Sequence, residues 1–338
     1  MWQLVGQTRV VSFLQRSLER GTLAHAYLLV GPPQVGKMTL ALDLARALNC
    51  EAAEAPCGTC ESCQKIASAK HADVQIIDLA GVRNSGEAKF QTEISIDQIR
   101  DLQHSASLPP FEGTFKVFII DGAELLSHEA ANSLLKTLEE PVGKVIFILL
   151  TTSDRLLPTT IVSRCQRLEL MPLAATEIES ALHGRVDIET AKAKLLASLS
   201  HGCFGWALSA ACSDEPLKQR SERLEQLLKV TSGDGEERFN YAFQLATKFS
   251  RNREPVRETL DLWLSWWRDL LLIKAACPNL ITNADLEATL ISHAQGYRLG
   301  QIRDFISSIE LALEQLKQNA NPQLALEVLM LSIPRRGE

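Results

Sequence analysis

The chain has 338 residues, of which 46% are hydrophobic and 22% charged, and its formal net charge is −6. This length predicts about two or three domains, and an acidic chain with a pI near 5.8 argues against a protein that binds nucleic acid by itself. No apolar run reaches the ~20 residues that span a bilayer, and the first residues lack a basic region followed by an apolar stretch, so we expect a soluble cytoplasmic protein with no membrane partner.

Short apolar runs alternate with helical patterns from residue 26 to residue 150. The runs are rich in β-branched and aromatic residues, which is typical of strands buried on both faces of a parallel sheet; they span 26–30, 74–77, 117–120 and 145–150. Helices are predicted between them, at 37–49, 96–106 and 127–139, and a fifth strand around 167–170. This alternation predicts a doubly wound α/β domain over residues 1–170.

The chain becomes helical after Pro172. We expect a small helical domain at 171–213, a hinge at Asp214-Glu215-Pro216, and an all-α domain at 214–338 with a loop at 232–235. Apolar residues recur there at helical spacing, in two stripes, and the first contains Trp263 and Trp267. Helix packing explains these tryptophans better than a platform for stacking nucleic-acid bases.

A glycine-rich loop, Gly31-Pro32-Pro33-Gln34-Val35-Gly36-Lys37, follows the first predicted strand and precedes a helix. This is the context of a phosphate-binding P-loop, in which Gly31 and Gly36 let the backbone amides face phosphate oxygens and Lys37 adds a positive charge. A Gly/Pro turn with an incidental lysine is the alternative.

Two residues that hydrolysis requires are missing from this predicted site. A hydroxyl should follow Lys37 to hold Mg²⁺, but Met38 stands there, and its thioether is a poor ligand for a hard cation. Thr39 comes one position late. Asp121 ends the predicted strand 117–120, where a carboxylate suits the Mg²⁺ shell, but Gly122 replaces the glutamate that would activate water. We therefore expect a degenerate site, and binding of ATP or ADP without turnover stays open.

Four cysteines, Cys50, Cys57, Cys60 and Cys63, lie within fourteen residues directly after the predicted P-loop helix. Their spacing predicts one tetrahedral Zn²⁺ in a structural zinc ribbon, because all four ligand positions are filled and none is left for a catalytic water. His71 is interpreted as a surface histidine. The remaining cysteines lack partner spacing and are expected to be small buried residues: Cys165, Cys203, Cys212 and Cys277.

Several motifs together resemble the clamp-loader branch of the AAA+ ATPases, over nearly the whole chain. They are Gly6-Gln7, Ala24-His25-Ala26-Tyr27, the cysteine insertion, and the segments at 131–141, 157–165 and 319–327. The resemblance implies an AAA+ P-loop domain with an inserted zinc ribbon, a helical lid and an all-α collar. It also implies work on a sliding clamp at primer–template DNA, in the bacterial cytoplasm at the nucleoid-associated replisome.

The departures from the family pattern resemble its delta prime subunits. Met38, Gly122 and Gly205 stand where an active motor subunit carries a hydroxyl, a glutamate and a sensor arginine, whereas Ser163-Arg164-Cys165 is intact. The resemblance therefore implies that Arg164 is an arginine finger for a neighbouring subunit of the tau/gamma type, beside a delta subunit; a surface salt bridge is the alternative. Thr151 and Thr152 occupy the sensor region or cap a strand end. An active clamp-loader ATPase and a zinc-ribbon DNA-binding protein are the other functions considered.

Overall fold

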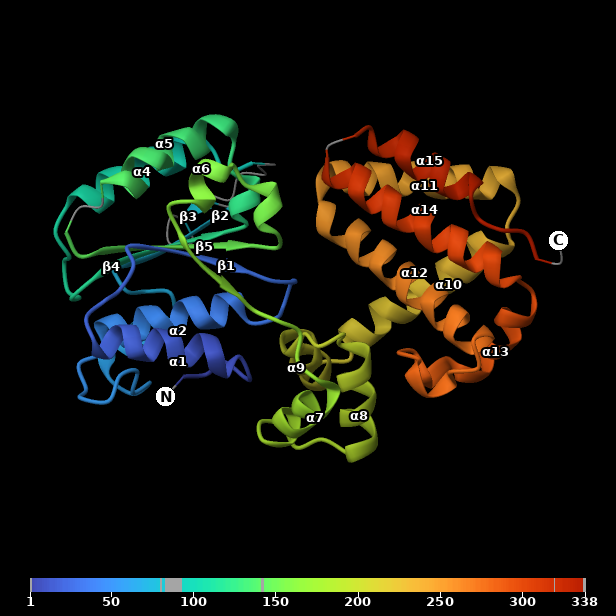
Figure 1. The fold of residues 1–338 in the computed structure, drawn as a ribbon, viewed down its shortest axis with the longest axis horizontal. Coiled ribbons are helices and arrows are strands. Elements are labelled where there is room, and N and C mark those ends of the chain that lie inside the picture. The colour runs from blue at the N-terminus through green and yellow to red at the C-terminus, as the bar shows by residue number, and fades with distance from the viewer. Residues whose placement is uncertain (1, 80, 83–92, 141–142, 319, 337–338) are drawn as a thin grey trace. The chain divides into compact units, whose positions relative to one another are not determined.

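The structure is a computed structural model that describes residues 2–79, 81–82, 93–140, 143–318 and 320–336 (Figure 1). The chain divides into two compact units: Met1–Ala181 with Gly202–Gly205, and Leu182–His201 with Trp206–Glu338. Each unit has its own hydrophobic core. Within the described residues, no helix combines the length and the apolar character needed to cross a membrane.

A six-stranded sheet forms the middle of the first unit, in the order β3-β2-β4-β5-β1-β6. Its strands are β1 (Ala26–Val30), β2 (Val74–Asp78), β3 (Gly81–Val82), β4 (Lys116–Asp121), β5 (Val145–Thr151) and β6 (Gln166–Glu169). Five of them are parallel, and β3 pairs antiparallel with β2 at one edge. The five predicted strands and the doubly wound parallel sheet are confirmed.

Helices cover both faces of this sheet, as Figure 1 shows for α1 and α2 on one side and α4 and α5 on the other. The helices of the unit are α1 (Thr8–Glu19), α2 (Lys37–Asn49), α3 (Glu61–Ala67), α4 (Ile96–Ser107), α5 (His128–Glu139) and α6 (Thr159–Val162). Because successive side chains of a strand point to opposite faces, Val117 and Ile119 enter the core under α1 and α2. Phe118 and Ile120 enter the core under α4 and α5.

Side-chain caps account for where the covering helices begin. Ser127, predicted as a cap, accepts a hydrogen bond from the N–H of Ala130 at the start of α5. Ser95 and Gln98 form a reciprocal capping box at the start of α4, which the sequence analysis did not single out. The three predicted helices of this unit are confirmed, and three further helices, α1, α3 and α6, were not predicted.

The second unit is helical. It holds α8 (Thr190–Leu199), α10 (Glu215–Ser232), α11 (Gly235–Arg251), α12 (Arg253–Lys274), α13 (Glu287–Gln295), α14 (Leu299–Lys317) and α15 (Pro322–Leu331), while α7 (Ala175–His183) and α9 (Phe204–Cys212) span the unit boundaries. Trp263 and Trp267 are buried, and the Trp267 ring lies 4.7 Å from that of Phe305 on α14, between ring centroids. The core interpretation of the tryptophans is therefore confirmed.

Two interpretations of local sequence were wrong, and the predicted loop holds with narrower bounds. Glu215 and Pro216 open α10 rather than form a hinge, because proline fits the first turn of a helix, where its missing N–H has no partner to lose. The loop predicted at 232–235 shrinks to two residues, since α10 continues through Ser232 and Asp234 caps α11. Cys212 and Cys277 are exposed rather than buried.

Candidate functional site

The P-loop connects β1 to α2 at the carboxyl edge of the sheet. Gly36 has φ 111°, a left-handed conformation that glycine adopts without strain. The Lys37 ammonium donates hydrogen bonds to the carbonyl oxygens of Gly31 (2.6 Å) and Pro32 (2.8 Å). Lys37 therefore folds back over the loop whose backbone a phosphate group would contact.

Apolar contacts occupy the position where a magnesium ligand is needed. Met38 is partly buried and packs against the core beneath α1 and α2. Thr39 is half-buried at the next position of α2, and one residue corresponds to about 100° around a helix axis. The Thr39 hydroxyl therefore does not take the place of the one missing at Met38.

The N-terminal segment lies against the P-loop, a contact that the sequence analysis missed. Asp43, fully buried on α2, accepts hydrogen bonds from the N–H groups of Gln3 (2.6 Å) and Leu4 (3.1 Å). Leu4 then lies over Gly36, where a Cβ atom would be 2.5 Å from its Cδ1. Burial raises the pKa of the Asp43 carboxyl despite these bonds. The signal was present, since Asp43 is the one acidic residue in the helix 37–49.

Residues 202–205 also lie against the P-loop, within the first unit. The N–H of Gly205 donates to the carbonyl oxygen of Gln34 at 3.0 Å. A Cβ atom on Gly205 would lie only 2.8 Å from that oxygen. No side chain fits here unless the segment moves.

The acidic part of the predicted site lies at the same edge of the sheet. Asp121 is the half-buried last residue of β4, and Thr151 is the last residue of β5. Because β5 lies between β4 and β1, both residues lie at the same edge of the sheet as the P-loop, which follows β1. Gly122 has φ 78° and ψ 53°. A glutamate in this left-handed conformation would be strained, so the backbone disfavours a residue larger than glycine here.

Thr151 and Thr152, at the end of β5, both form hydrogen bonds within the chain. Glu124 accepts hydrogen bonds at Oε1 from the Thr152 N–H (3.1 Å) and the Thr152 hydroxyl (2.9 Å). The Thr151 hydroxyl donates to the carbonyl oxygen of Ser153 at 3.0 Å. These contacts support the strand-end interpretation. The role of Glu124 had no local signal, because its partner lies 28 residues away along the chain.

Arg164 lies at the surface of the first unit, two residues after the end of α6. Its guanidinium donates to the carbonyl oxygen of Thr160 at 2.9 Å and to the carboxylate of Glu139 at 2.5 Å, and its side chain is 34% exposed. Surface exposure is what an arginine that acts on a neighbouring subunit requires. The salt bridge of the alternative interpretation is present as well.

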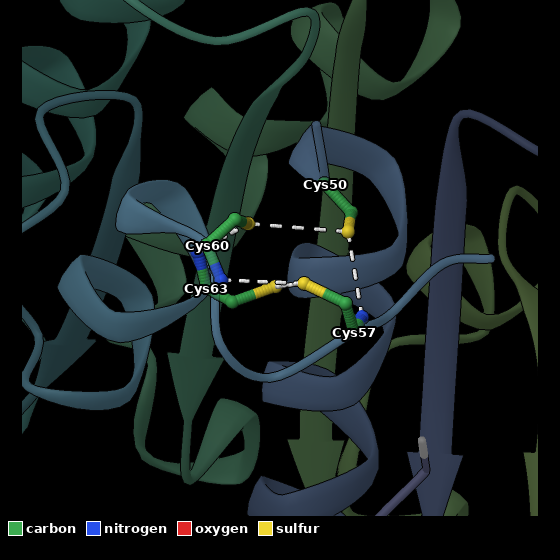
Figure 2. A group of neighbouring side chains, drawn as sticks. All are labelled: Cys50, Cys57, Cys60 and Cys63. Carbon is green, nitrogen blue, oxygen red and sulfur yellow. Dashed lines mark hydrogen bonds between the residues drawn. The ribbon is translucent and has the colours of Figure 1, made fainter. Parts of the chain in front are cut away.

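The four cysteines predicted to bind zinc converge between the end of α2 and the start of α3 (Figure 2). Their sulfur atoms all lie within 4.8 Å of one another, and the Cys50–Cys60 and Cys57–Cys63 pairs are 4.0 Å apart. A tetrahedral zinc ion with Zn–S bonds of about 2.3 Å separates its sulfurs by about 3.8 Å. The cluster therefore fits a tetrahedral metal ion with small adjustments.

Backbone N–H groups surround these sulfur atoms. The N–H groups of Cys60 and Thr59, with the Thr59 hydroxyl, lower the pKa of the Cys57 thiol to about 5, whereas burial raises the pKa of Cys63 to about 12. Donors aimed at sulfur stabilise the thiolate form that a metal ion needs.

A polar network joins α3 to the loop before β4. Buried Asp73 accepts hydrogen bonds from the N–H groups of Phe111, Glu112 and Gly113, at 2.7–2.8 Å. Lys65 on α3 donates to Glu112 at 2.7 Å. The interpretation of His71 as a surface histidine was wrong, because it is 2% exposed and its Nδ1 accepts the N–H of Asp73.

Comparison with known proteins gives two family matches. The family described as "DNA polymerase III, delta subunit" matches residues 6–174, and "DNA polymerase III, delta subunit, C terminal" matches residues 214–334. The delta' subunit of Bacillus subtilis DNA polymerase III is 30% identical over 330 residues, which cover 97% of this chain and 96% of that protein.

The tau subunits are also similar, over part of their length. The Bacillus subtilis tau subunit is 29% identical over 98% of this chain, which spans 60% of that relative. The Escherichia coli tau subunit is 36% identical over 69% of this chain, which spans 33% of it. The chain thus covers less than two thirds of either tau relative.

Among solved structures, a gamma subunit-related protein from Thermotoga maritima aligns over 95% of this chain and 97% of its own, with 18% identity and a TM-score of 0.45. Because this TM-score is below 0.5, the assignment rests on the sequence relatives. The family match over residues 6–174 and the 30% identity over nearly the whole delta' relative show that the chain belongs to the DNA polymerase III delta-subunit family of clamp-loader AAA+ proteins.

Proposed function

We propose that this chain is the delta prime subunit of a bacterial DNA polymerase III clamp loader. In this function it assembles with tau/gamma motor subunits and a delta subunit, and the complex loads a sliding clamp onto primer–template DNA in the cytoplasm. The supporting comparison is the delta' relative, which is 30% identical to this chain over 330 residues.

One observation carries the proposal that the subunit does not hydrolyse ATP itself. The three positions that an active site needs hold Met38, Gly122 and Gly205, and at the two glycines the backbone resists a larger residue. Lys37 and Asp121 remain, so the P-loop can hold a nucleotide without turnover. This combination favours a degenerate site over an active one.

Arg164 supplies the catalytic contribution, in trans. A guanidinium next to the γ-phosphate of a neighbouring subunit stabilises the negative charge that spreads onto its oxygens during phosphoryl transfer. The exposed position of Arg164 after α6 is compatible with this role, because the side chain does not have to leave a core to reach another subunit.

The cysteine cluster holds one structural Zn²⁺ in this proposal. All four ligands come from the protein, through Cys50, Cys57, Cys60 and Cys63, so no position is left for a reacting water. The ion would brace the segment between α2 and α3.

The finger role is tested with Arg164→Ala in a reconstituted loader whose other ATP sites are inactivated. We expect ATP turnover at the neighbouring site to fall about 10³-fold, the loss typical of a missing arginine finger. Arg155→Ala, at an exposed arginine nine residues earlier in the chain, is the matched control. Undiminished turnover in the Arg164 variant, with assembly intact, contradicts the role.

Purified chain with Mg-ATP tests the degenerate site. We expect no turnover, whereas a rate of about 1 s⁻¹ that Lys37→Ala abolishes would favour an active ATPase. Tight, salt-sensitive binding of DNA by the isolated chain would instead favour the DNA-binding alternative.

A further inference from the structure

The Arg164 guanidinium is held by two groups from different helices, and Nη1 also lies 3.5 Å from the Ser163 hydroxyl oxygen. The carbonyl oxygen of Thr160, on α6, accepts from Nη1 at 2.9 Å, and Glu139, the last residue of α5, accepts from Nη2 at 2.5 Å. Among the described residues, none accepts a hydrogen bond from Nε of Arg164. Since a guanidinium has five N–H donors, these contacts orient the group and leave donors for a further partner.

The Glu139 side chain is attached to a well-anchored part of the fold. Leu138 is 1% exposed in the core beneath α4 and α5, and its carbonyl oxygen lies 2.8 Å from Nε2 of His25. The end of α5 is therefore held both by apolar packing and by a polar contact.

Helix electrostatics do not account for a glutamate at this position. The C-terminal end of a helix carries partial negative charge, so an acidic side chain in the last turn is unfavourable there. Glu139 is half exposed, with 49% of its side chain accessible. Its one ion pair among the described residues is with Arg164, which identifies the arginine as its partner.

We propose that Glu139 is a positioning residue, which holds the Arg164 guanidinium in one orientation before it meets the neighbouring subunit's phosphate. This inference rests on the trans role of Arg164. An unrestrained arginine loses rotamer freedom when it binds, and this loss can lower the rate by a factor of about 30 at most. A side chain that is already ordered avoids part of that loss.

The test measures kcat and KM for ATP in the reconstituted loader, with other ATP sites inactivated, for Glu139→Ala and Glu139→Gln. For Glu139→Ala we expect kcat to fall about threefold to tenfold, because the Thr160 contact remains. We expect KM, complex assembly and the thermal midpoint to be unchanged. Glu139→Gln keeps an oxygen acceptor, so its kcat should lie between those of the unmodified protein and Glu139→Ala. Glu140→Gln, at the adjacent exposed carboxylate, is the control.

Arg164→Ala in the same assay separates the two proposals. If it abolishes turnover while Glu139→Ala leaves kcat unchanged, the positioning role is wrong and the finger role stands. A rise in kcat in Glu139→Ala also overturns the proposal, because Glu139 would then restrain the finger. Loss of assembly in this variant overturns it as well, because Glu139 would then lie in the subunit interface. If Arg164→Ala is fully active, the finger role itself fails.

Discussion

Gly205 is a position next to the P-loop where the backbone leaves no room for a side chain. Its N–H donates a hydrogen bond to the Gln34 carbonyl oxygen, and a Cβ at this position would lie only 2.8 Å from that oxygen. Gly122 imposes a similar limit through its left-handed backbone. The local structure therefore opposes larger residues at both glycine positions.

Gly205→Ala should lower the free energy of unfolding by about 1–3 kcal/mol, because the new methyl group overpacks against the P-loop. Gly300→Ala is the matched control, since Gly300 is also the second residue of a helix and has nothing within 4 Å of its Cβ position. Urea denaturation of both variants checks this. Equal stabilities for the two variants would show that residues 202–205 are not held against the loop.

Asp73 gives the first unit an acid-sensitive contact. Burial raises the pKa of its carboxyl, but the N–H groups of Phe111, Gly113 and Glu112 stabilise the ionised form, and the net effect lowers the pKa. Between the folded and unfolded pKa values the unfolded chain binds more protons. The stability from Asp73 is therefore present above the ordinary carboxyl pKa of about 4, and it is lost as the pH falls through the folded value.

Asp73→Asn should destabilise the protein by about 1–3 kcal/mol at pH 7, because an amide oxygen cannot satisfy the donors that two carboxylate oxygens accept. The difference from the unmodified protein should shrink as the pH falls below about 4. Unfolding free energies between pH 7 and pH 3 measure this. The exposed Asp97→Asn serves as control, and a pH-independent deficit for Asp73→Asn would rule the mechanism out.

At the scale of elements, α3 depends on its surroundings. It has seven residues, too few for a helix to be stable in water by itself. Two of the clustered cysteines anchor it, since Cys60 caps its start and Cys63 lies in its first turn. The Lys65–Glu112 pair joins it to the loop before β4. Metal binding and the order of this helix are therefore expected to be coupled.

Metal analysis should find one zinc per chain in the unmodified protein and none after Cys60→Ser, because three thiolates hold the ion far less well than four. The variant should also lose helical signal and melt at a lower temperature. Cys277→Ser, at an exposed cysteine outside the cluster, should keep the zinc. Full zinc content in Cys60→Ser would mean that the cluster is not the metal site.

At the scale of the whole molecule, the two compact units are not continuous segments of the chain. Leu182–His201 belongs to the second unit, whereas Gly202–Gly205 belongs to the first. Within the second unit, the Ser198 hydroxyl donates to the carbonyl oxygen of Thr282 at 3.1 Å, and Leu196 is buried. The family boundary at residue 214 therefore lies inside the second unit as the structure defines it.

A fragment of residues 182–338 should unfold cooperatively, because it contains the whole second unit. A fragment of residues 214–338 should be less stable, since it lacks α8 and the contact of Ser198 with Thr282. Thermal unfolding of the two fragments compares them. Equal midpoints would show that residues 182–201 add nothing to the stability of this unit.

The sequence by itself determined the architecture of the first unit and predicted the residues of its candidate site. Buried parallel strands need continuous apolar runs, so residues 117–120 and 145–150 could be predicted as strands from their own sequence. The P-loop, the replacements at Met38 and Gly122, and the four cysteines are local patterns, and local spacing carries their chemistry. The resemblance to clamp-loader proteins then placed Arg164.

Only the tertiary structure decided which distant groups meet. Glu124 with Thr152, Glu139 with Arg164, and Gly205 with Gln34 are separated along the chain, and no local period brings such pairs together. The sequence could not predict the burial of single residues for the same reason. His71 was interpreted as a surface residue but is buried, and Cys277 was interpreted as a buried residue but is exposed. Periodicity reports which face of an element is apolar, whereas contacts between elements depend on how the whole chain packs.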